Sequence, residues 1–192
     1  MDSALRALAL CCCALPLFVQ AQQLAPASPP AAGLETSWEI APAIEAIGAH
    51  AQRLLPALDR VDARAWVNQG ASETYLEQLD ASKQQARALA DGAKALARNP
   101  ERLSVGLVVL FRIQGIENML GSLEEGLRKY QNPAEAQKLA TLEAENGANR
   151  DRLEAYLVSL AAAQEQQYQV MDREAQRCRG VQSIPAPPGR KK

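Results

Sequence analysis

The chain has 192 residues and almost balanced charge, with 21 Lys and Arg against 22 Asp and Glu and a formal net charge of −1. This balance argues against a nucleic-acid-binding protein, which needs a strongly basic face. A single histidine is too few for a di-iron bundle, and the sequence lacks the Cys-x-x-Cys-His motif of covalent haem. It also lacks a Gly-x-Ser-x-Gly elbow and a glycine-rich phosphate loop. We therefore expect no metal or cofactor and find no support for an enzyme.

Residues 1–21 have the pattern of a secretory signal peptide. Arg6 lies in a short charged start, residues 8–19 form an apolar run, and Val19-Gln20-Ala21 is a small-residue cleavage site. The run is shorter than the roughly 20 residues that a membrane-spanning helix needs. The residues before Cys11, Cys12 and Cys13 do not suit lipoprotein processing. We expect cleavage after Ala21, a secreted or periplasmic mature protein, and no stable membrane insertion after cleavage.

Cleavage would remove three of the four cysteines and leave Cys178 alone, so the mature protein could form no internal disulfide. A single thiol in an oxidising compartment predicts either an intermolecular disulfide at Cys178 or a free, protected thiol. Arg177 and Arg179 flank it and would favour the thiolate. An incidental cysteine at a helix end is the simpler interpretation.

The domain organisation follows from composition and periodicity. Residues 22–36 are expected to be a disordered leader, and residues 180–192 a disordered, Pro-rich basic tail. Residues 37–179 have a helical hydrophobic period throughout and no alternating pattern typical of a strand. We predict an all-α protein, an antiparallel bundle of four long helices, or five if the last helical stretch breaks.

The first helix is predicted from apolar residues at alternating steps of four and three, a coiled-coil-like seam. Pro56 falls on the opposite side, so we expect one curved helix that ends at Gly70. The seam residues are Ile40, Ile44, Ile47, Ala51, Leu54, Leu58, Val61 and Ala65. The lone histidine, His50, is expected to be a surface or packing residue.

The second helix is expected to start after Ser72 as N-cap, and its many seam alanines predict close approach to a neighbour. Asn99-Pro100 should end it and open the third helix directly, since Asn is a good N-cap and Pro suits the first helical position. The third helix should run from Pro100 to Tyr130. Residues 105–111 are apolar nearly all round, which predicts the most buried helix. Close packing is predicted at Gly115, Gly121 and Gly126.

The fourth helical stretch is expected to start at Asn132-Pro133 and to continue to about Cys178. Asn146 and Asn149 occupy positions of the core type in its seam, which we extend through Gln167 and Val170. Asn146-Gly147 is a plausible C-cap, and Asn149 could then cap a following helix. The stretch is therefore one long helix or two.

Counting outward from a turn at Gln131/Asn132 aligns the third and fourth helices as an antiparallel hairpin. Gln114 then meets Asn149, Glu117 meets Asn146, and leucines also align. The simpler interpretation is a buried hydrogen-bonded network that fixes the register. The alternative is a ligand-binding pocket in the bundle core. The candidate residues, which we call the polar layer, are Arg112, Gln114, Glu117, Glu145, Asn146, Asn149 and Arg150.

These features favour a structural or interaction role in the cell envelope or outside the cell, as an adaptor or chaperone-like bundle with a second copy or another protein as partner. Residues 161–177 support this role, because glutamines crowd a sparse apolar stripe that is too polar for full burial. The alternative is a carrier of a small molecule or lipid, which would need a cavity near the polar layer. No specific activity follows from the sequence.

Overall fold

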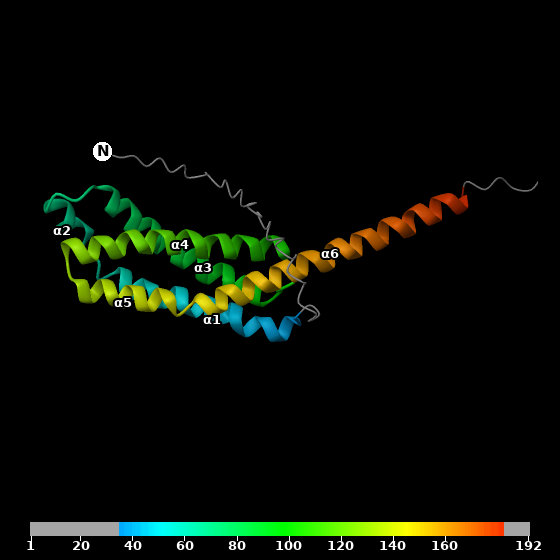
Figure 1. The fold of residues 1–192 in the computed structure, drawn as a ribbon, viewed down its shortest axis with the longest axis horizontal. Helices are drawn as coiled ribbons and strands as arrows, with labels where there is room; N and C mark the ends of the chain where they lie inside the picture. The colour runs from blue at the N-terminus through cyan, green and yellow to red at the C-terminus, as the bar shows by residue number, and fades with distance from the viewer. Residues whose placement is uncertain (1–34, 183–192) are drawn as a thin grey trace, which may run out of the picture. The chain divides into compact units, whose positions relative to one another are not determined.

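The computed structural model of the chain describes residues 35–182, with side chains described through residue 179. The predicted signal peptide and most of the predicted leader and tail lie outside these residues. The described residues belong to one compact unit. Its helices are α1 (Ser37–Leu58), α2 (Ala63–Asn68), α3 (Thr74–Ala97), α4 (Leu103–Tyr130), α5 (Pro133–Ala144) and α6 (Gly147–Gln182) (Figure 1).

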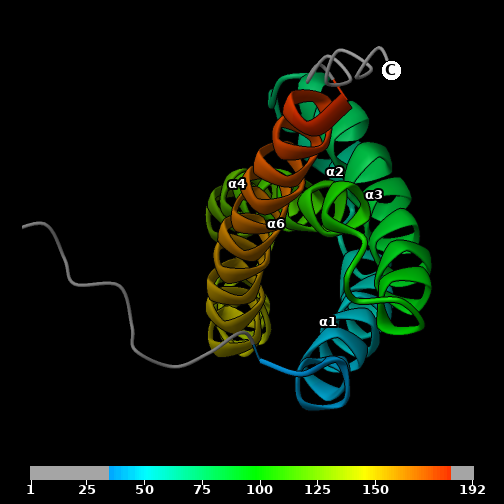
Figure 2. The same cartoon turned by 90° about the vertical axis from the view of Figure 1, so that its right-hand side faces the viewer.

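The helices form an antiparallel bundle. α3 packs between α1 and α4, while α5 and the first half of α6 together occupy the fourth position, against α4 and α1 (Figures 1 and 2). Buried isoleucine, leucine and alanine side chains from all of these helices form one hydrophobic core. The predicted all-α bundle of four or five helices is confirmed.

The seam predicted for the first helix is buried from Ile40 to Val61, and Pro56 is exposed as expected. However, the expected single curved helix is wrong, because α1 ends at Leu58, two residues after Pro56. A proline removes one backbone hydrogen bond and weakens the last turn. Asp62 then starts α2, and its side chain accepts a hydrogen bond from the Ala65 amide (2.9 Å).

Gly70 terminates α2, and it does so in the left-handed conformation, with φ of 94°. The Ala71 amide donates to the Trp66 carbonyl (3.0 Å), and the Gly70 amide donates to the Val67 carbonyl (2.9 Å). These are the two bonds of a Schellman motif, which glycine accommodates without steric cost. The predicted helix-ending role of Gly70 is therefore confirmed, although the helix that it ends is the short α2.

Trp66 anchors α2 in the core. Its ring lies against Gly126 of α4, where an added Cβ would come within 2.4 Å of the ring atom Cζ3. Tyr75 and Tyr130 pack on the same ring, with centroid distances of 5.4 and 6.3 Å. The predicted close packing at α4 glycines is thus confirmed at Gly126. It is wrong at the other two positions, Gly115 and Gly121, where an added Cβ would meet nothing within 4 Å.

The two Asn-Pro junctions differ. Asn132 caps α5 as predicted, with its Oδ1 accepting from the Ala134 amide (2.8 Å) and Pro133 in the first turn. At Asn99-Pro100 the prediction is wrong, because the chain makes a turn and α4 begins only at Leu103. The Arg102 carbonyl accepts from the Gly106 amide (3.0 Å) and so makes the first bond of α4.

The first third of α4 is less buried than predicted. Gly106, Val109 and Leu110 face the bundle, whereas Leu107, Val108 and Phe111 are 37%, 47% and 63% exposed. The expectation that α4 is buried all round is therefore wrong here, since its neighbours cover only one face. Among the described helices, α4 alone has the length and apolar composition of a membrane span, a test that core helices of bundles also pass.

Candidate functional site

The polar layer lies where the fourth helical position is interrupted. α5 ends at Ala144 and α6 begins at Gly147. The fourth helical stretch is therefore two helices, with the break at the predicted position, Asn146-Gly147. Asn146 is buried in this break, and its carbonyl accepts from the Arg150 amide (3.0 Å) to start α6. Asn149 lies inside α6 and does not cap it. Gly147 does not form a left-handed C-cap, because Gly70 alone among the described glycines has a positive φ.

Contacts between α4 and the fourth position agree with the predicted alignment. Gly106 packs against Leu157, and Glu117 and Asn146 line the same small cavity. Each pair lies at equal numbers of residues from the turn. Gln114 is exposed, and among the described residues no hydrogen bond joins its side chain to that of Asn149.

Glu117 is instead held by Arg150, one helical turn after Asn146. Arg150 Nη1 donates to both carboxylate oxygens of Glu117 (3.1 and 3.2 Å), and Nη2 donates to Asp151 (2.8 Å). The hydrogen bond to Asp151, followed by the charge of Glu117, raises the pKa of the Arg150 guanidinium above its ordinary value. The long arginine side chain reaches back along α6, which residue counting alone does not anticipate.

Two other predicted members of the layer bind elsewhere. Arg112 Nη1 donates to the Ala88 carbonyl of α3 (2.9 Å). Glu145 accepts from Arg53 of α1 (2.6 Å) in an ion pair whose side chains are about half exposed. The structure therefore groups Glu117, Asn146 and Arg150 at the α5–α6 break.

Sequence reasoning missed His50 as a member of this layer. His50 is 4% exposed, and its Nε2 lies 2.7 Å from the Leu142 carbonyl of α5. Because a carbonyl only accepts, Nε2 carries the hydrogen. Leu142 is in the last turn of α5, where carbonyls lack helical partners. His50 therefore caps α5 from α1, a contact that depends on the tertiary arrangement of two helices far apart in sequence.

The space beside these residues is small. His50, Glu117, Glu143 and Asn146 line a cavity of about 10 Å³ together with apolar side chains. His50 Nδ1 and Asn146 Oδ1 are buried and have no protein partner. A cavity of this size has room for about one water molecule, whereas ligand pockets occupy roughly 300–1,000 Å³. Its volume gives the carrier alternative no support at this layer.

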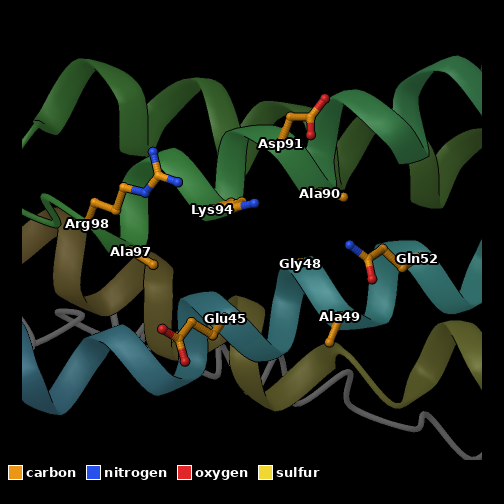
Figure 3. A pocket seen from close by; sticks show the side chains of 9 residues that line it. All are labelled: Glu45, Gly48, Ala49, Gln52, Ala90, Asp91, Lys94, Ala97 and Arg98. Carbon is orange, nitrogen blue, oxygen red and sulfur yellow. The ribbon is translucent and has the colours of Figure 1, made fainter.

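A larger hollow of about 530 Å³ opens between α1 and α3 (Figure 3). The residues on its floor are small, and they allow the two helices to approach closely. A Cβ added at Gly48 would lie 3.2 Å from the Ala93 Cβ. This agrees with the close approach predicted for the alanine-rich second helix. The rim carries charges of both signs, and the groove contains no buried polar group. Its lining residues are Glu45, Gly48, Ala49, Gln52, Ala90, Asp91, Lys94, Ala97 and Arg98.

The last part of α6 forms a second candidate surface. Every residue from 165 to 179 is exposed, and we call this segment the α6 extension (Figure 1). It includes Tyr168, Val170 and Met171, which are 68%, 50% and 57% exposed, and the free thiol of Cys178.

Within residues 35–179, no group of three or more His, Cys, Asp or Glu side chains is placed to hold a metal ion. No protein-family model, curated protein or solved structure matches the chain. The fold defines the class of the protein as an all-α antiparallel bundle in which the fourth position is divided between α5 and α6.

Proposed function

We propose that the protein is a secreted or periplasmic helical bundle that acts by binding another protein chain, in an adaptor or chaperone-like role. The observation that carries this proposal is the α6 extension, in which 15 consecutive helical residues have no cover within the described part of the chain. An isolated helix of this length is marginal in water. A partner surface would supply the packing that the bundle does not.

The exposed apolar side chains support the same interpretation. One end of the bundle, which we call the exit end, is where Glu101 accepts from Ser37 (3.1 Å) and from Gln164 (3.5 Å), just before the α6 extension begins. The large exposed apolar residues of the described chain lie near this end or on α6. Clustered exposed apolar surface is typical of interaction sites. These residues are Trp38, Leu107, Val108, Phe111, Val158, Tyr168, Val170 and Met171.

A photo-crosslinking amino acid tests the proposal in the organism that makes the protein. Placed at Tyr168 or Phe111, it should give a discrete protein adduct, whereas the same group at exposed Asn68 of α2 should give none. The absence of an adduct from both test positions would contradict the proposal. Native mass spectrometry addresses the carrier alternative, which predicts a small-molecule adduct on the purified protein.

Export is tested separately by sequencing the N-terminus of the protein from the cell envelope or the culture fluid. Cleavage after Ala21 gives a mature N-terminus at Gln22. Protein found in the cytoplasm with an intact Met1 would contradict the secreted or periplasmic location.

A further inference from the structure

The α6 extension continues the face that α6 buries inside the bundle. Leu153, Leu157 and Leu160 are buried, and further steps of three or four residues lead through Gln164 to the extension. There the same face carries Tyr168, Met171, Ala175 and Cys178, which we call the extension seam. The expected seam through Tyr156 and Leu160, which are also buried, leads to Gln167 and Val170 beside this face. The extension seam is a packing face with no helix of the described chain upon it.

We propose that a second copy of this chain covers the extension seam with its own seam, in an antiparallel pair related by a two-fold axis. This inference rests on the proposed interaction role and names the partner. A two-fold interface uses the same patch on both copies, so it requires a self-complementary surface. The direction of the second helix and the charge pattern both bear on that requirement.

The direction follows from what already packs on α6. Because the extension seam is the bundle-facing side of α6, a parallel second helix would run into the space occupied by α1 and α4. An antiparallel helix lies beyond the exit end instead. The extension is about 21 Å long at 1.5 Å per residue, so the tip of each helix reaches the base of the other.

Charge complementarity favours the same direction. The base of the extension is acidic, with Glu165 near exposed Glu101, whereas the tip carries Arg177 and Arg179. A register that places Tyr168 opposite Cys178 of the second copy brings Glu165 beside Arg179, and two-fold symmetry makes this pair twice. In coiled helices, charged residues that flank the apolar seam determine the choice of partner and its direction.

The same register also brings Asp172 close to Asp172, and Glu174 close to Glu174, of the second copy, on the two sides of the two-fold axis. These like-charge contacts and the shortness of the seam predict a weak dimer that dissociates on dilution. The extension itself is neutral, with Glu165, Asp172 and Glu174 balanced by Arg173, Arg177 and Arg179, so no net repulsion opposes association.

The antiparallel register fixes the position of Cys178 relative to the second copy. Cys178 faces Tyr168 of the second copy, which lies about 15 Å along the helix from the second copy's Cys178. Disulfides need Cα atoms within about 7 Å. The predicted intermolecular disulfide of Cys178 therefore does not form between the two copies of this dimer.

Thiol bridging tests the register. The mature protein, residues 22–192, is prepared as wild type, Tyr168→Cys, and Tyr168→Cys with Cys178→Ser, and is treated with a short bismaleimide. The single variant should give covalent dimers, because its new thiol faces Cys178 of the second copy. Wild type and the double variant should stay uncrosslinked, as should Gln169→Cys on the outer face. A parallel pair would instead bridge wild type and the double variant as well, because each seam thiol would then face its own copy.

Charge reversal tests the pairing without a crosslinker. Glu165→Arg and Arg179→Glu should each raise the dimer Kd about threefold to tenfold in sedimentation experiments. The double reversal should return it to within about twofold of wild type. These positions are exposed, so the melting temperature of the bundle serves as the control for folding.

The outcomes separate this inference from the proposed function. A protein that stays monomeric up to millimolar concentration, or charge reversals that do not compensate, would overturn the self-pairing. If Tyr168 then still crosslinks to a different protein in cells, the interaction role stands and only the partner is wrong. If no dimer forms and neither Tyr168 nor Phe111 crosslinks to any protein, both proposals fail.

Discussion

Gly106 of α4 lies directly against Leu157 of α6, so that a Cβ added at Gly106 would come within 2.3 Å of Leu157 Cδ2. Leu157 is buried, and the two residues stand at equal numbers of residues before and after the turn at Gln131/Asn132. The missing side chain at Gly106 therefore fixes how closely and in which register α6 can approach α4.

Substitution of this glycine tests the contact. Gly106→Ala should lower the free energy of unfolding by about 1–3 kcal/mol, because the buried Leu157 must shift. The matched control is Gly121→Ala in the same helix, where an added Cβ meets nothing within 4 Å. That change should raise stability by up to about 1 kcal/mol through helix propensity. Equal effects of the two substitutions in urea denaturation would contradict the packing described.

Removing the His50 cap should destabilise the α5–α6 break. His50→Leu leaves the Leu142 carbonyl without its side-chain donor and should cost about 1–3 kcal/mol. His50→Gln retains a donor of similar reach and should recover part of this loss. Hydrogen exchange adds a local readout, since amides near residue 146 should exchange faster in the leucine variant. Unchanged stability and exchange would show that the contact contributes nothing.

Gln131 joins the two connections at the opposite end of the bundle. Its Oε1 accepts from Trp66 Nε1 and from the Asp62 amide (both 3.1 Å), and its Nε2 donates to the Arg60 carbonyl (3.0 Å). Gln131→Ala should lower the free energy of unfolding by about 1–3 kcal/mol, since Trp66 is fully buried and loses this acceptor.

The control for Gln131 is Gln137→Ala on the exposed side of α5, which should change stability by less than about 0.5 kcal/mol. Chemical denaturation measures both variants. A loss at Gln137 as large as that at Gln131 would indicate a general effect of removing an amide side chain.

Glu124 should make stability depend on pH in an unusual direction for a carboxylate. Burial, and next the negative charge of Glu143, raise the pKa of Glu124 above its ordinary 4.5. Between 4.5 and the folded pKa the folded state binds more protons than the unfolded state. This contribution to stability is therefore complete below 4.5 and is lost as the pH rises through the folded pKa.

Glu124→Gln should raise the melting temperature at pH 7 and leave it nearly unchanged at pH 4. The neighbouring Glu125→Gln is the control, because Glu125 is exposed. A lower melting temperature for the Glu124 variant at pH 7 would show that the attraction of Glu124 to Arg128 outweighs the effect of its burial.

The local pattern of the sequence predicts which face of each helix is apolar. It succeeds for α1, where the predicted seam residues from Ile40 to Leu58 are buried as expected, and for the α4 register seen at Gly106 and Leu157. Both results follow from helical periodicity and from a short turn with a good cap at Asn132. These signals act within a few residues or across one hairpin.

The errors concern what lies opposite an apolar face. The periodicity of α4 does not reveal that Phe111 is 63% exposed, and that of α6 does not reveal that the helix extends beyond the helices packed against it. His50 was missed for a similar reason, since its partner is a carbonyl made available by a helix end 92 residues away. The structure brings Glu117, Asn146 and Arg150 together at the α5–α6 break, but the hydrogen bonds between Arg150 and Glu117 depend on side-chain reach.

The two tryptophans of the chain stand in opposite environments. Trp66 is fully buried beside Tyr75 and Tyr130, whereas Trp38 is 75% exposed at the start of α1, beside the exit end. The protein thus carries two native fluorophores with separate meanings. Iodide should quench Trp38 selectively, so emission from Trp66 reports whether the core is intact. A blue shift of Trp38 emission and a loss of its quenching would show, without any added label, that a molecule has bound at the exit end.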